Sequence, residues 1–284
     1  MLQVFYSFLY GIIEGITEWL PISSTGHLIL FEQAVGWTNN EAMATFLEMF
    51  RVVIQLGAIM AVVLLYWNKL WPFSKKKSLK QRNGTLRMWA LVIVGCLPAA
   101  IIGLLFDDKI DAIFYNFPTV AVTLVIYGVL FILVENLIKQ GKIQTTRETF
   151  GRLDIKTAAL IGAFQVLALI PGTSRSGVTI LGAIILGCSR SLAAEYSFFL
   201  SIPVMVGASL LKCVKLGAEM IGKGTTFTAT EVWMLIVGIL TAFIVSVFAI
   251  KFLMNFIKKH DFKPFGYYRI ALGIIVLIVY IFTI

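Results

Sequence analysis

Apolar stretches long enough to cross a lipid bilayer recur from one end of this chain to the other, and they constrain its fold more than any other feature. Hydrophobic residues make up 59% of the 284 residues, and charged residues only 14%. An average soluble domain is about 45–50% apolar and about 25% charged, so this chain has too little polar surface for a water-soluble globule. The sequence predicts an all-α polytopic membrane protein surrounded by membrane lipids. Disordered chains, disulfide scaffolds and soluble nucleic-acid-binding domains are excluded, so no nucleic-acid partner is expected.

The chain contains about ten apolar helical segments whose lengths follow a repeated order. A full crossing needs about 20 residues, and three of the segments are clearly shorter. Each half of the chain begins with two segments that meet at a Pro-containing polar loop and continues with three longer segments. The ten segments are 2–20, 25–37, 43–67, 88–106, 117–138, 155–170, 177–189, 193–215, 229–253 and 266–284.

The two halves also resemble each other weakly in sequence. Gly11-x-x-Glu14 followed by Pro21-x-Ser23-Ser24-Thr25 matches Gly162-x-x-Gln165 followed by Pro171-x-Thr173-Ser174-Arg175. Because each half has an odd number of segments, the second half must be inverted in the membrane relative to the first. We therefore expect a single membrane domain over 1–284, with repeat one at 1–138, a cytoplasmic linker at 139–154 and repeat two at 155–284.

Positive charge gathers in the loops on one side of this arrangement. Stretches 69–87, 139–156 and 251–269 hold seven, five and five Lys and Arg residues, and Arg190 adds one, so 18 of the 24 fall on this side. Lys and Arg accumulate in cytoplasmic loops, so this side is predicted to be cytoplasmic, with both termini outside.

The two polar loops, 21–26 and 171–177, can meet only if the short segments do not cross. If every segment crossed fully, one loop would be cytoplasmic and the other external. If each short pair instead enters the membrane and returns, the loops approach from opposite sides and both end near the midplane. Irregular backbone at that depth is tolerated only in a protein interior or a wet cavity, so we expect a buried site there.

Glu14 and Glu18 lie four residues apart, and therefore on one face of a helix, inside an otherwise apolar segment. Ionisable side chains are costly in a membrane, which favours a functional role over a structural ion pair. If two carboxylates are to bind an anionic ligand such as a phosphate, they require a divalent cation or a proton, and hard oxygen ligands favour Mg²⁺ or Ca²⁺. These two residues are the predicted metal ligands.

The first polar loop ends in three hydroxyl residues, Ser23, Ser24 and Thr25, followed by Gly26 and His27. Simple capping of the next helix is the alternative reading, since Ser and Thr are preferred at that position. Capping does not require His27, however. Ser24 and His27 are three residues apart, so they can act as a hydroxyl nucleophile with an adjacent base, or His27 can receive the phosphoryl group itself.

The second polar loop combines hydroxyls and glycines with Arg175 at the start of another helix. The free N–H groups and the dipole of a helix N-terminus favour an anion, and the planar guanidinium suits phosphate oxygens. The alternative is an Arg paired with a membrane carboxylate, for which Glu18 is the candidate. The predicted phosphate-binding residues of both loops are Ser23, Thr25, Gly26, Gly172, Thr173, Ser174, Ser176 and Thr179.

Other charged residues within the apolar segments are weaker signals. Glu48 and Arg51 lie three residues apart and are expected to pair with each other. Glu195 begins a long segment near Arg190 and is expected to cap it.

At these residues the sequence resembles the undecaprenyl-pyrophosphate phosphatase family, the bacitracin-resistance type of integral membrane phosphatase. The resemblance rests on Glu14-Gly-Ile-Thr-Glu18-Trp-Leu-Pro-Ile-Ser-Ser-Thr-Gly-His27 and on Pro171-Gly-Thr-Ser-Arg-Ser-Gly-Val-Thr179. It implies hydrolysis of an isoprenyl pyrophosphate lipid to the monophosphate and inorganic phosphate, which recycles the carrier lipid of cell-wall synthesis. It also implies a divalent cation, a homodimer, and a site in the bacterial inner membrane that opens to the outer, periplasmic side.

Carried onto this chain, the resemblance makes Glu14 and Glu18 the residues that hold the metal or manage protons. Ser24 becomes the candidate nucleophile with His27 as its base, or His27 the nucleophile, and Arg175 clamps the pyrophosphate. The rival prediction is a secondary transporter or lipid flippase for an anionic phosphate-bearing substrate, because inverted repeats with broken helices are typical of transporters. A nucleophile, a base and carboxylates in one cluster favour the phosphatase, since transport does not require them.

Overall fold

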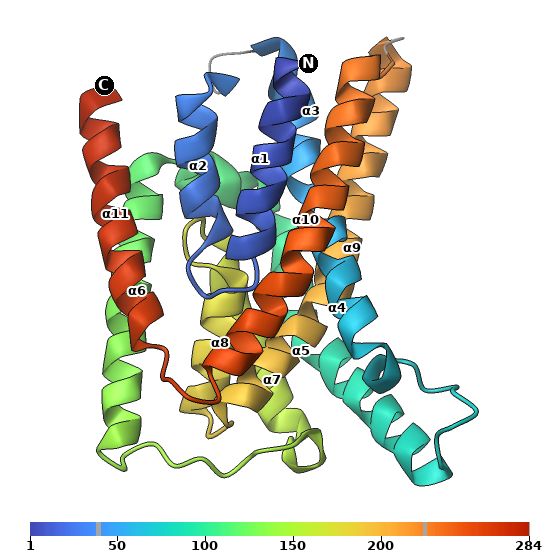
Figure 1. Ribbon diagram of the computed structural model, residues 1–284, viewed down its shortest axis with the longest axis vertical. Helices are drawn as coiled ribbons and strands as arrows, with labels where there is room; N and C mark the ends of the chain where they lie inside the picture. The colour runs from blue at the N-terminus through green and yellow to red at the C-terminus, as the bar shows by residue number, and fades with distance from the viewer. Residues whose placement is uncertain (38–40, 224–225, 284) are drawn as a thin grey trace.

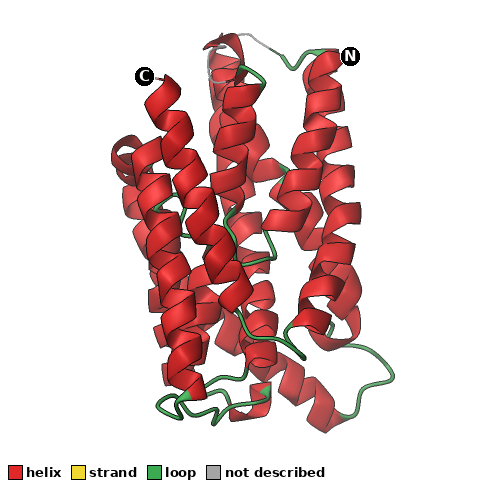
Figure 2. Ribbon diagram, turned by 60° about the vertical axis from the view of Figure 1, so that its left-hand side comes forward, coloured by secondary structure: helices red, strands yellow, loops and turns green. Residues whose placement is uncertain are grey.

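The computed structural model describes the chain except for residues 38–40, 224–225 and 284, and it is a helical bundle (Figure 1). Figure 2 shows helices and loops and no strand among the described residues. The all-α fold predicted from the composition is therefore confirmed. The helices are α1 (Leu2–Thr17), α2 (Ser24–Ala34), α3 (Glu41–Val53), α4 (Gln55–Leu70), α5 (Leu79–Phe114), α6 (Phe117–Lys139), α7 (Ile155–Val166), α8 (Arg175–Ile185), α9 (Arg190–Lys223), α10 (Ala229–Phe256) and α11 (Lys263–Thr283), with short 3₁₀ turns at Phe150–Arg152 and Leu167–Leu169.

Six helical stretches among the described residues are long and apolar enough to cross a membrane. The other helices form two re-entrant pairs. In Figure 1, α1 runs inward from the N-terminus and α2 returns to the same end, whereas α7 and α8 enter from the opposite end. The predicted plan of one re-entrant pair and three spans per half is confirmed. The six stretches are Phe46–Leu70, Leu79–Phe106, Phe117–Lys139, Arg190–Lys215, Ala229–Phe256 and Lys263–Phe282.

Two segments differ from the sequence prediction in their boundaries. The third segment consists of two helices, α3 and α4, because the helix is interrupted at Ile54. The fourth begins at Leu79, well inside the expected basic loop, because Ser78 and Gln81 cap its first turn reciprocally. The Ser78 N–H donates to Gln81 Oε1, and the Gln81 N–H donates to Ser78 Oγ.

The inversion of the halves is visible where helices approach each other at glycines. A Cβ on Gly11 of α1 would lie 2.7 Å from the carbonyl oxygen of Gly238 in α10. The equivalent contact in the second half joins α7 and α5, where a Cβ on Gly162 would lie 2.4 Å from the carbonyl oxygen of Gly95. Each re-entrant pair is thus held against a long helix of the other half, so neither half could form its site alone.

A third contact relates the two halves to each other directly. A Cβ on Gly128 of α6 would lie 2.7 Å from the Gly266 carbonyl of α11, and a Cβ on Gly266 would lie 2.7 Å from the Gly128 carbonyl. This reciprocity makes α6 and α11 equivalent elements packed across the pseudo-twofold axis.

The centre of the bundle is occupied by α8, in which residues 176–184 are all buried. The polar side chains of this buried helix, Ser176 and Thr179, are satisfied by hydrogen bonds to the surrounding protein. Near it, Trp19 packs edge-on against Phe198 of α9, with ring centroids 5.2 Å apart. The core therefore surrounds the two loop tips with rigid helices.

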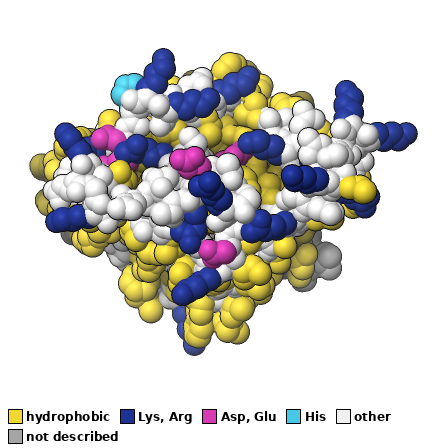
Figure 3. All heavy atoms as spheres, turned by 90° about the horizontal axis from the view of Figure 1, so that it is seen from below, with side chains coloured by type: hydrophobic (Ala, Val, Ile, Leu, Met, Phe, Trp, Pro, Cys, Tyr) yellow, Lys and Arg dark blue, Asp and Glu magenta, His cyan; other side chains and the backbone are white. Residues whose placement is uncertain are grey.

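The basic stretches predicted to share one side do lie at one end of the bundle, at the bottom of Figure 1, and Lys and Arg side chains spread over that end in Figure 3. At this end α7 begins at its N-cap Asp154. Hydrogen bonds from the Thr157 N–H and from Arg147 lower the pKa of Asp154 to about 2, so the cap is ionised at neutral pH.

The glycine contacts predict opposite stability effects for two Gly→Ala changes. Gly162→Ala forces a methyl group against the Gly95 carbonyl and should destabilise the protein by roughly 1–3 kcal/mol, the scale of overpacking. Gly84→Ala in α5 meets nothing within 4 Å and should stabilise by roughly 0.5–1 kcal/mol, because alanine favours the helix. Thermal unfolding of both variants in detergent checks this; equal melting temperatures would contradict the close approach of α5 and α7.

Candidate active site

The tips of the two re-entrant pairs have the same local geometry. Ser23 and Ser174 cap α2 and α8 with φ angles of +73° and +70°, values rare for a residue with a side chain. Among the described non-glycine residues, only these two have positive φ. Each serine Oγ accepts a hydrogen bond from the backbone N–H three residues later, at Gly26 and Gly177. Both helix N-termini are therefore built alike and face the same interior.

This geometry corrects the alignment of the two loops predicted from sequence. Ser23 is equivalent to Ser174, and not to Thr173. The prediction was wrong by one residue because it matched two prolines that do not occupy equivalent positions. In the corrected register, Ser24 is the first residue of α2 and Arg175 is the first residue of α8. The candidate nucleophile and the candidate phosphate clamp thus stand at equivalent points of the two repeats.

Glu18 joins the two tips. Its Oε1 lies 2.8 Å from Nη2 of Arg175, and its Oε2 accepts a hydrogen bond from Ser24 Oγ at 2.9 Å. Arg175 also donates to the Ser197 carbonyl at 2.8 Å, and Ser176 Oγ donates to the Glu18 carbonyl at 3.0 Å. The ion pair is nearly enclosed, with side-chain exposures of 10% for Arg175 and 7% for Glu18. The resting partner that the sequence suggested for Arg175 is thus the one observed.

His27 lies beside this cluster but bonds elsewhere. Its Nδ1 is 2.8 Å from the Ser23 carbonyl oxygen, and its Nε2 is 2.8 Å from the hydroxyl of Tyr268 in α11. Among the described residues, no hydrogen bond joins His27 to Ser24. The carboxylate of Glu18, and not the imidazole, is the basic group that receives the Ser24 hydroxyl. A role for His27 as the base of Ser24 stays a prediction.

Glu14 is fully buried, and neither of its carboxylate oxygens has a hydrogen-bond partner among the described residues. Gln165, its equivalent in the second repeat, is also buried with both side-chain polar atoms unpaired. Buried polar groups are normally satisfied, so these atoms indicate a position for a ligand, a proton or water. The unpaired Glu14 carboxylate fits the hard-oxygen chemistry of Mg²⁺ or Ca²⁺, and Glu18 follows four residues later as the C-cap residue of α1.

The hydroxyls of the second loop divide into two groups. Thr173 is buried with its Oγ1 unpaired, so it can accept a ligand. The Ser176 hydroxyl is committed to the Glu18 backbone, and the Thr179 hydroxyl to the Arg175 carbonyl and to Ser197 Oγ. These two residues hold the site's framework in place, and direct phosphate contacts by them stay a prediction. So do those expected of Thr25, Gly26, Gly172 and Ser174.

Two residues of α11 that the sequence reasoning missed belong to this site. Tyr268 contacts His27, and Arg269 donates to carbonyl oxygens of both loops. Arg269 was counted among the cations of the basic loop, but it is fully buried inside the bundle. An arginine placed four residues into the last apolar segment was the signal that could have found it.

The expected Glu48–Arg51 pair is not formed. Arg51 instead binds Glu32 through two hydrogen bonds of 2.8 and 2.6 Å, and Tyr10 donates to the same carboxylate. Glu48 is exposed, whereas Glu32 is 1% exposed, so Arg51 compensates the carboxylate that has no access to water.

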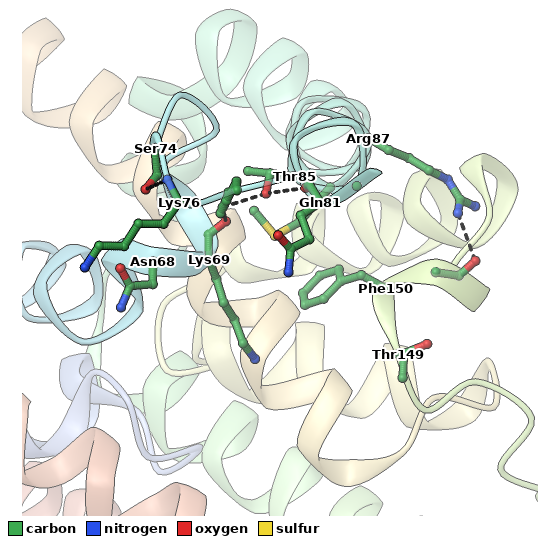
Figure 4. Close-up of a pocket in the computed structure, with 13 residues that line it drawn as sticks. Asn68, Lys69, Ser74, Lys76, Gln81, Thr85, Arg87, Thr149 and Phe150 are labelled. Atoms are coloured by element: carbon green, nitrogen blue, oxygen red, sulfur yellow. Dashed lines mark hydrogen bonds between the residues drawn. The ribbon is translucent and has the colours of Figure 1, made fainter. Parts of the chain in front are cut away.

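The capping role expected of Glu195 is not observed either, because α9 begins at Arg190 and Glu195 lies inside it. Glu195 forms an ion pair with Lys69, and Arg190 binds Glu135 through both carboxylate oxygens. Lys69 lines a cavity of about 660 Å³ at the basic end, shown in Figure 4, together with Lys76, Lys77 and Arg87. This cavity lies in the basic loops and contains none of the predicted catalytic residues, so it is not the candidate active site.

Comparison with known proteins agrees with this geometry. Residues 7–275 match the family described as bacitracin resistance protein BacA. The chain belongs to the BacA family.

Its relatives in this family are similar over nearly their whole length. An undecaprenyl-diphosphatase of Acetivibrio thermocellus is 58% identical over 281 residues, covering 99% of both chains. An undecaprenyl-diphosphatase of Enterococcus faecalis is 54% identical over 275 residues, covering 97% of this chain and 96% of the relative. That of Streptococcus mutans is 52% identical over 275 residues, covering 97% and 95%. Both loop tips and all eleven described helices fall largely within the BacA match.

The planar guanidinium of Arg175 predicts a large loss of activity even for a substitution that keeps the positive charge. Arg175→Lys cannot keep the contact with the Ser197 carbonyl while also presenting a planar pair of donors to the phosphate that replaces Glu18. We expect phosphate release to fall by at least about 10²-fold, the scale for removing one charge-stabilising donor from a shielded site. Near-normal turnover of the Lys variant would remove Arg175 from the clamp role.

The Ser24–Glu18 hydrogen bond predicts that Ser24, and not His27, carries the phosphoryl group. Ser24→Ala should lose at least about 10³-fold in turnover, because the covalent route is removed. Ser24→Cys should retain a trace. The chemical stability of a trapped phosphoenzyme distinguishes the two nucleophiles, since phosphoserine survives acid and phosphohistidine does not. An acid-labile adduct, or substantial activity in Ser24→Ala, would assign the attack to His27.

Proposed function

We propose that this chain hydrolyses undecaprenyl pyrophosphate to undecaprenyl phosphate and inorganic phosphate, which returns the carrier lipid to cell-wall synthesis. Its BacA family membership and relatives named undecaprenyl-diphosphatase at up to 58% identity support the reaction. The observation on the chain itself that carries the proposal is the bridge at Glu18, which receives the Ser24 hydroxyl and is ion-paired with Arg175. Glu18 is the base in this arrangement, and it contacts both the nucleophile Ser24 and the phosphate-binding Arg175.

In the first chemical step, Ser24 Oγ attacks the terminal phosphorus and Glu18 takes the hydroxyl proton. The bond between that phosphorus and the bridging oxygen breaks, and undecaprenyl phosphate leaves. Water then attacks the phosphoserine, inorganic phosphate leaves, and a proton returns to Ser24. Arg175 must release Glu18 to bind phosphate oxygens, and this release makes the carboxylate a stronger base when substrate is bound.

Glu14 would hold the divalent cation, while Glu18, the second ligand predicted from the sequence, serves as the base in this reaction. When bound, the cation would neutralise charge on the phosphate oxygens. The N-termini of α2 and α8 supply backbone N–H groups to the same anion. The isoprenyl chain of the substrate would remain in the lipid bilayer.

The location that we propose is the bacterial inner membrane, with the site open to the outer, periplasmic side. The concentration of Lys and Arg at the opposite end of the bundle supports this orientation (Figure 3). The homodimer implied by the family resemblance stays a prediction.

Phosphate release by purified protein in detergent tests the function against a transporter or flippase. Hydrolysis needs no second compartment, whereas transport does. We expect release of inorganic phosphate from an isoprenyl pyrophosphate by the wild type, dependent on a divalent cation and abolished by chelation. A folded wild-type protein that releases none with Mg²⁺ or Ca²⁺ present would leave the transporter as the better account.

The orientation predicts which exposed positions an impermeant thiol reagent reaches on intact cells. In a background without Cys96, Cys188 and Cys213, a cysteine at Thr226 should be labelled, and cysteines at Asn83 or Thr145 should be protected. The reason is that the stretches holding positions 83 and 145 lie at the basic, cytoplasmic end. Labelling at 83 with protection at 226 would invert the orientation.

A further inference from the structure

A single arginine holds the backbones of both loop tips. Arg269 of α11 is fully buried. Its Nη1 donates to the Pro21 carbonyl of the first tip at 3.3 Å, and its Nη2 donates to the Gly172 and Thr173 carbonyls of the second tip at 2.9 and 3.0 Å. Because the tips come from different repeats and enter from opposite ends, this guanidinium sets their separation directly.

The symmetry of the fold does not require an arginine at this position. The reciprocal contact of Gly128 and Gly266 makes position 131 of α6 the equivalent of position 269. The same contact confirms the register, since a Cβ on Gly128 would lie 3.2 Å from Arg269 Cβ and a Cβ on Gly266 would lie 3.4 Å from Phe131 Cβ. Phe131 is 1% exposed. The first repeat thus buries an apolar side chain where the second repeat carries a charge at the junction of the two tips.

The charge of Arg269 is not matched by a carboxylate. The ion pairs of the described residues do not include Arg269, whose neighbours are carbonyl oxygens and the face of Tyr127, 5.7 Å away. Burying a cation in a membrane protein is costly, which marks such a residue as functional. Here it adds positive potential beneath the tips, where the pyrophosphate is expected. Three carbonyls in two loops match the guanidinium fork, which a lysine ammonium does not reproduce.

The preceding residue of α11 acts on His27. The Tyr268 hydroxyl lies 2.8 Å from Nε2 of His27, and the two rings are stacked at 12° with centroids 5.6 Å apart. Since Nδ1 faces the Ser23 carbonyl, which can only accept, the neutral ring carries its proton on Nδ1 and accepts from Tyr268 at Nε2. The Ser23 carbonyl therefore fixes the tautomer of His27, and Tyr268 fixes the orientation of its ring.

We propose that Tyr268 and Arg269 are positioning residues for the hydrolysis, through which α11 aligns both re-entrant tips. Arg269 sets the distance between the Ser24 and Arg175 helix ends, and Tyr268 sets the imidazole beside them. The two Nη atoms of Arg269 and the Tyr268 hydroxyl are engaged with these partners, and through them both side chains act on the residues they hold. Arg269 Nε has no partner among the described residues, so a direct contact with substrate would come from that atom and would change KM. The inference rests on the proposed phosphatase function.

The test is a comparison of kcat and KM in detergent, with farnesyl pyrophosphate as the substrate. We expect Arg269→Gln and Arg269→Lys to lower kcat by about 10²-fold with KM within about threefold, because misplacing the reacting groups affects the chemical step. Tyr268→Phe should lower kcat about five- to tenfold, the scale of one hydrogen bond. The matched control is Tyr267→Phe, at an exposed neighbouring residue, which should remain within about twofold of wild type.

Each outcome bears on the proposal. A rise in KM with unchanged kcat would make Arg269 a substrate-binding charge and overturn the positioning role. Wild-type kcat in folded Arg269→Lys would also overturn the positioning role. Loss of folded protein in both Arg269 variants would overturn it too, because it would show that Arg269 serves stability. Equal kcat values for Tyr268→Phe and Tyr267→Phe would show that Tyr268 has no positioning role. An inactive wild type would contradict the proposed function itself, and is thus distinguishable from these results.

Discussion

The ion pair between Glu18 and Arg175 is the contact on which the arrangement of the site depends. It joins the end of α1 to the start of α8, two elements that enter the bundle from opposite ends. Breaking a buried pair by removing one partner typically costs about 3–5 kcal/mol, because the remaining charge is left uncompensated. A phosphate group that replaces Glu18 as the partner of Arg175 avoids that cost. In the proposed reaction, this contact therefore keeps Arg175 and Glu18 paired until substrate binds, and the phosphate then takes the place of Glu18 beside Arg175.

The bilayer explains why so much hydrogen bonding surrounds two short loops. Backbone groups at membrane depth have no water to satisfy them. Thr123 of α6 donates to the Pro171 carbonyl, Arg269 of α11 donates to the next carbonyls, and Ser176 donates to the Glu18 backbone. Some buried side-chain groups of the described residues still remain unpaired, among them those of Glu14, Gln165 and Thr173, and they are therefore informative. They lie on or next to the helices and loops that carry the proposed catalytic residues.

Much of this organisation could be predicted from the sequence because it follows from length, parity and charge. The segments 25–37 and 177–189 are too short to cross the membrane, and this predicted the re-entrant pairs. The residues that meet at the centre, Glu18, Ser24 and Arg175, were found because polar groups in apolar segments are rare. What failed depended on tertiary contacts. The partners of Arg51 and Glu195 lie far away in the chain. The loop register depends on backbone angles at Ser23 and Ser174, and the interior position of Arg269 depends on how α11 packs against α6.

The central claim is that residues from both repeats act as one catalytic group, and a double-mutant cycle on Glu18 and Arg175 tests it most directly. The measurement is kcat/KM for Glu18→Gln, Arg175→Gln and the double variant, each confirmed as folded in detergent. Residues that act together lose activity non-additively, so the double variant should fall within about threefold of the worse single variant. Losses that multiply would show two independent contributions, and would contradict a single site built across the repeats.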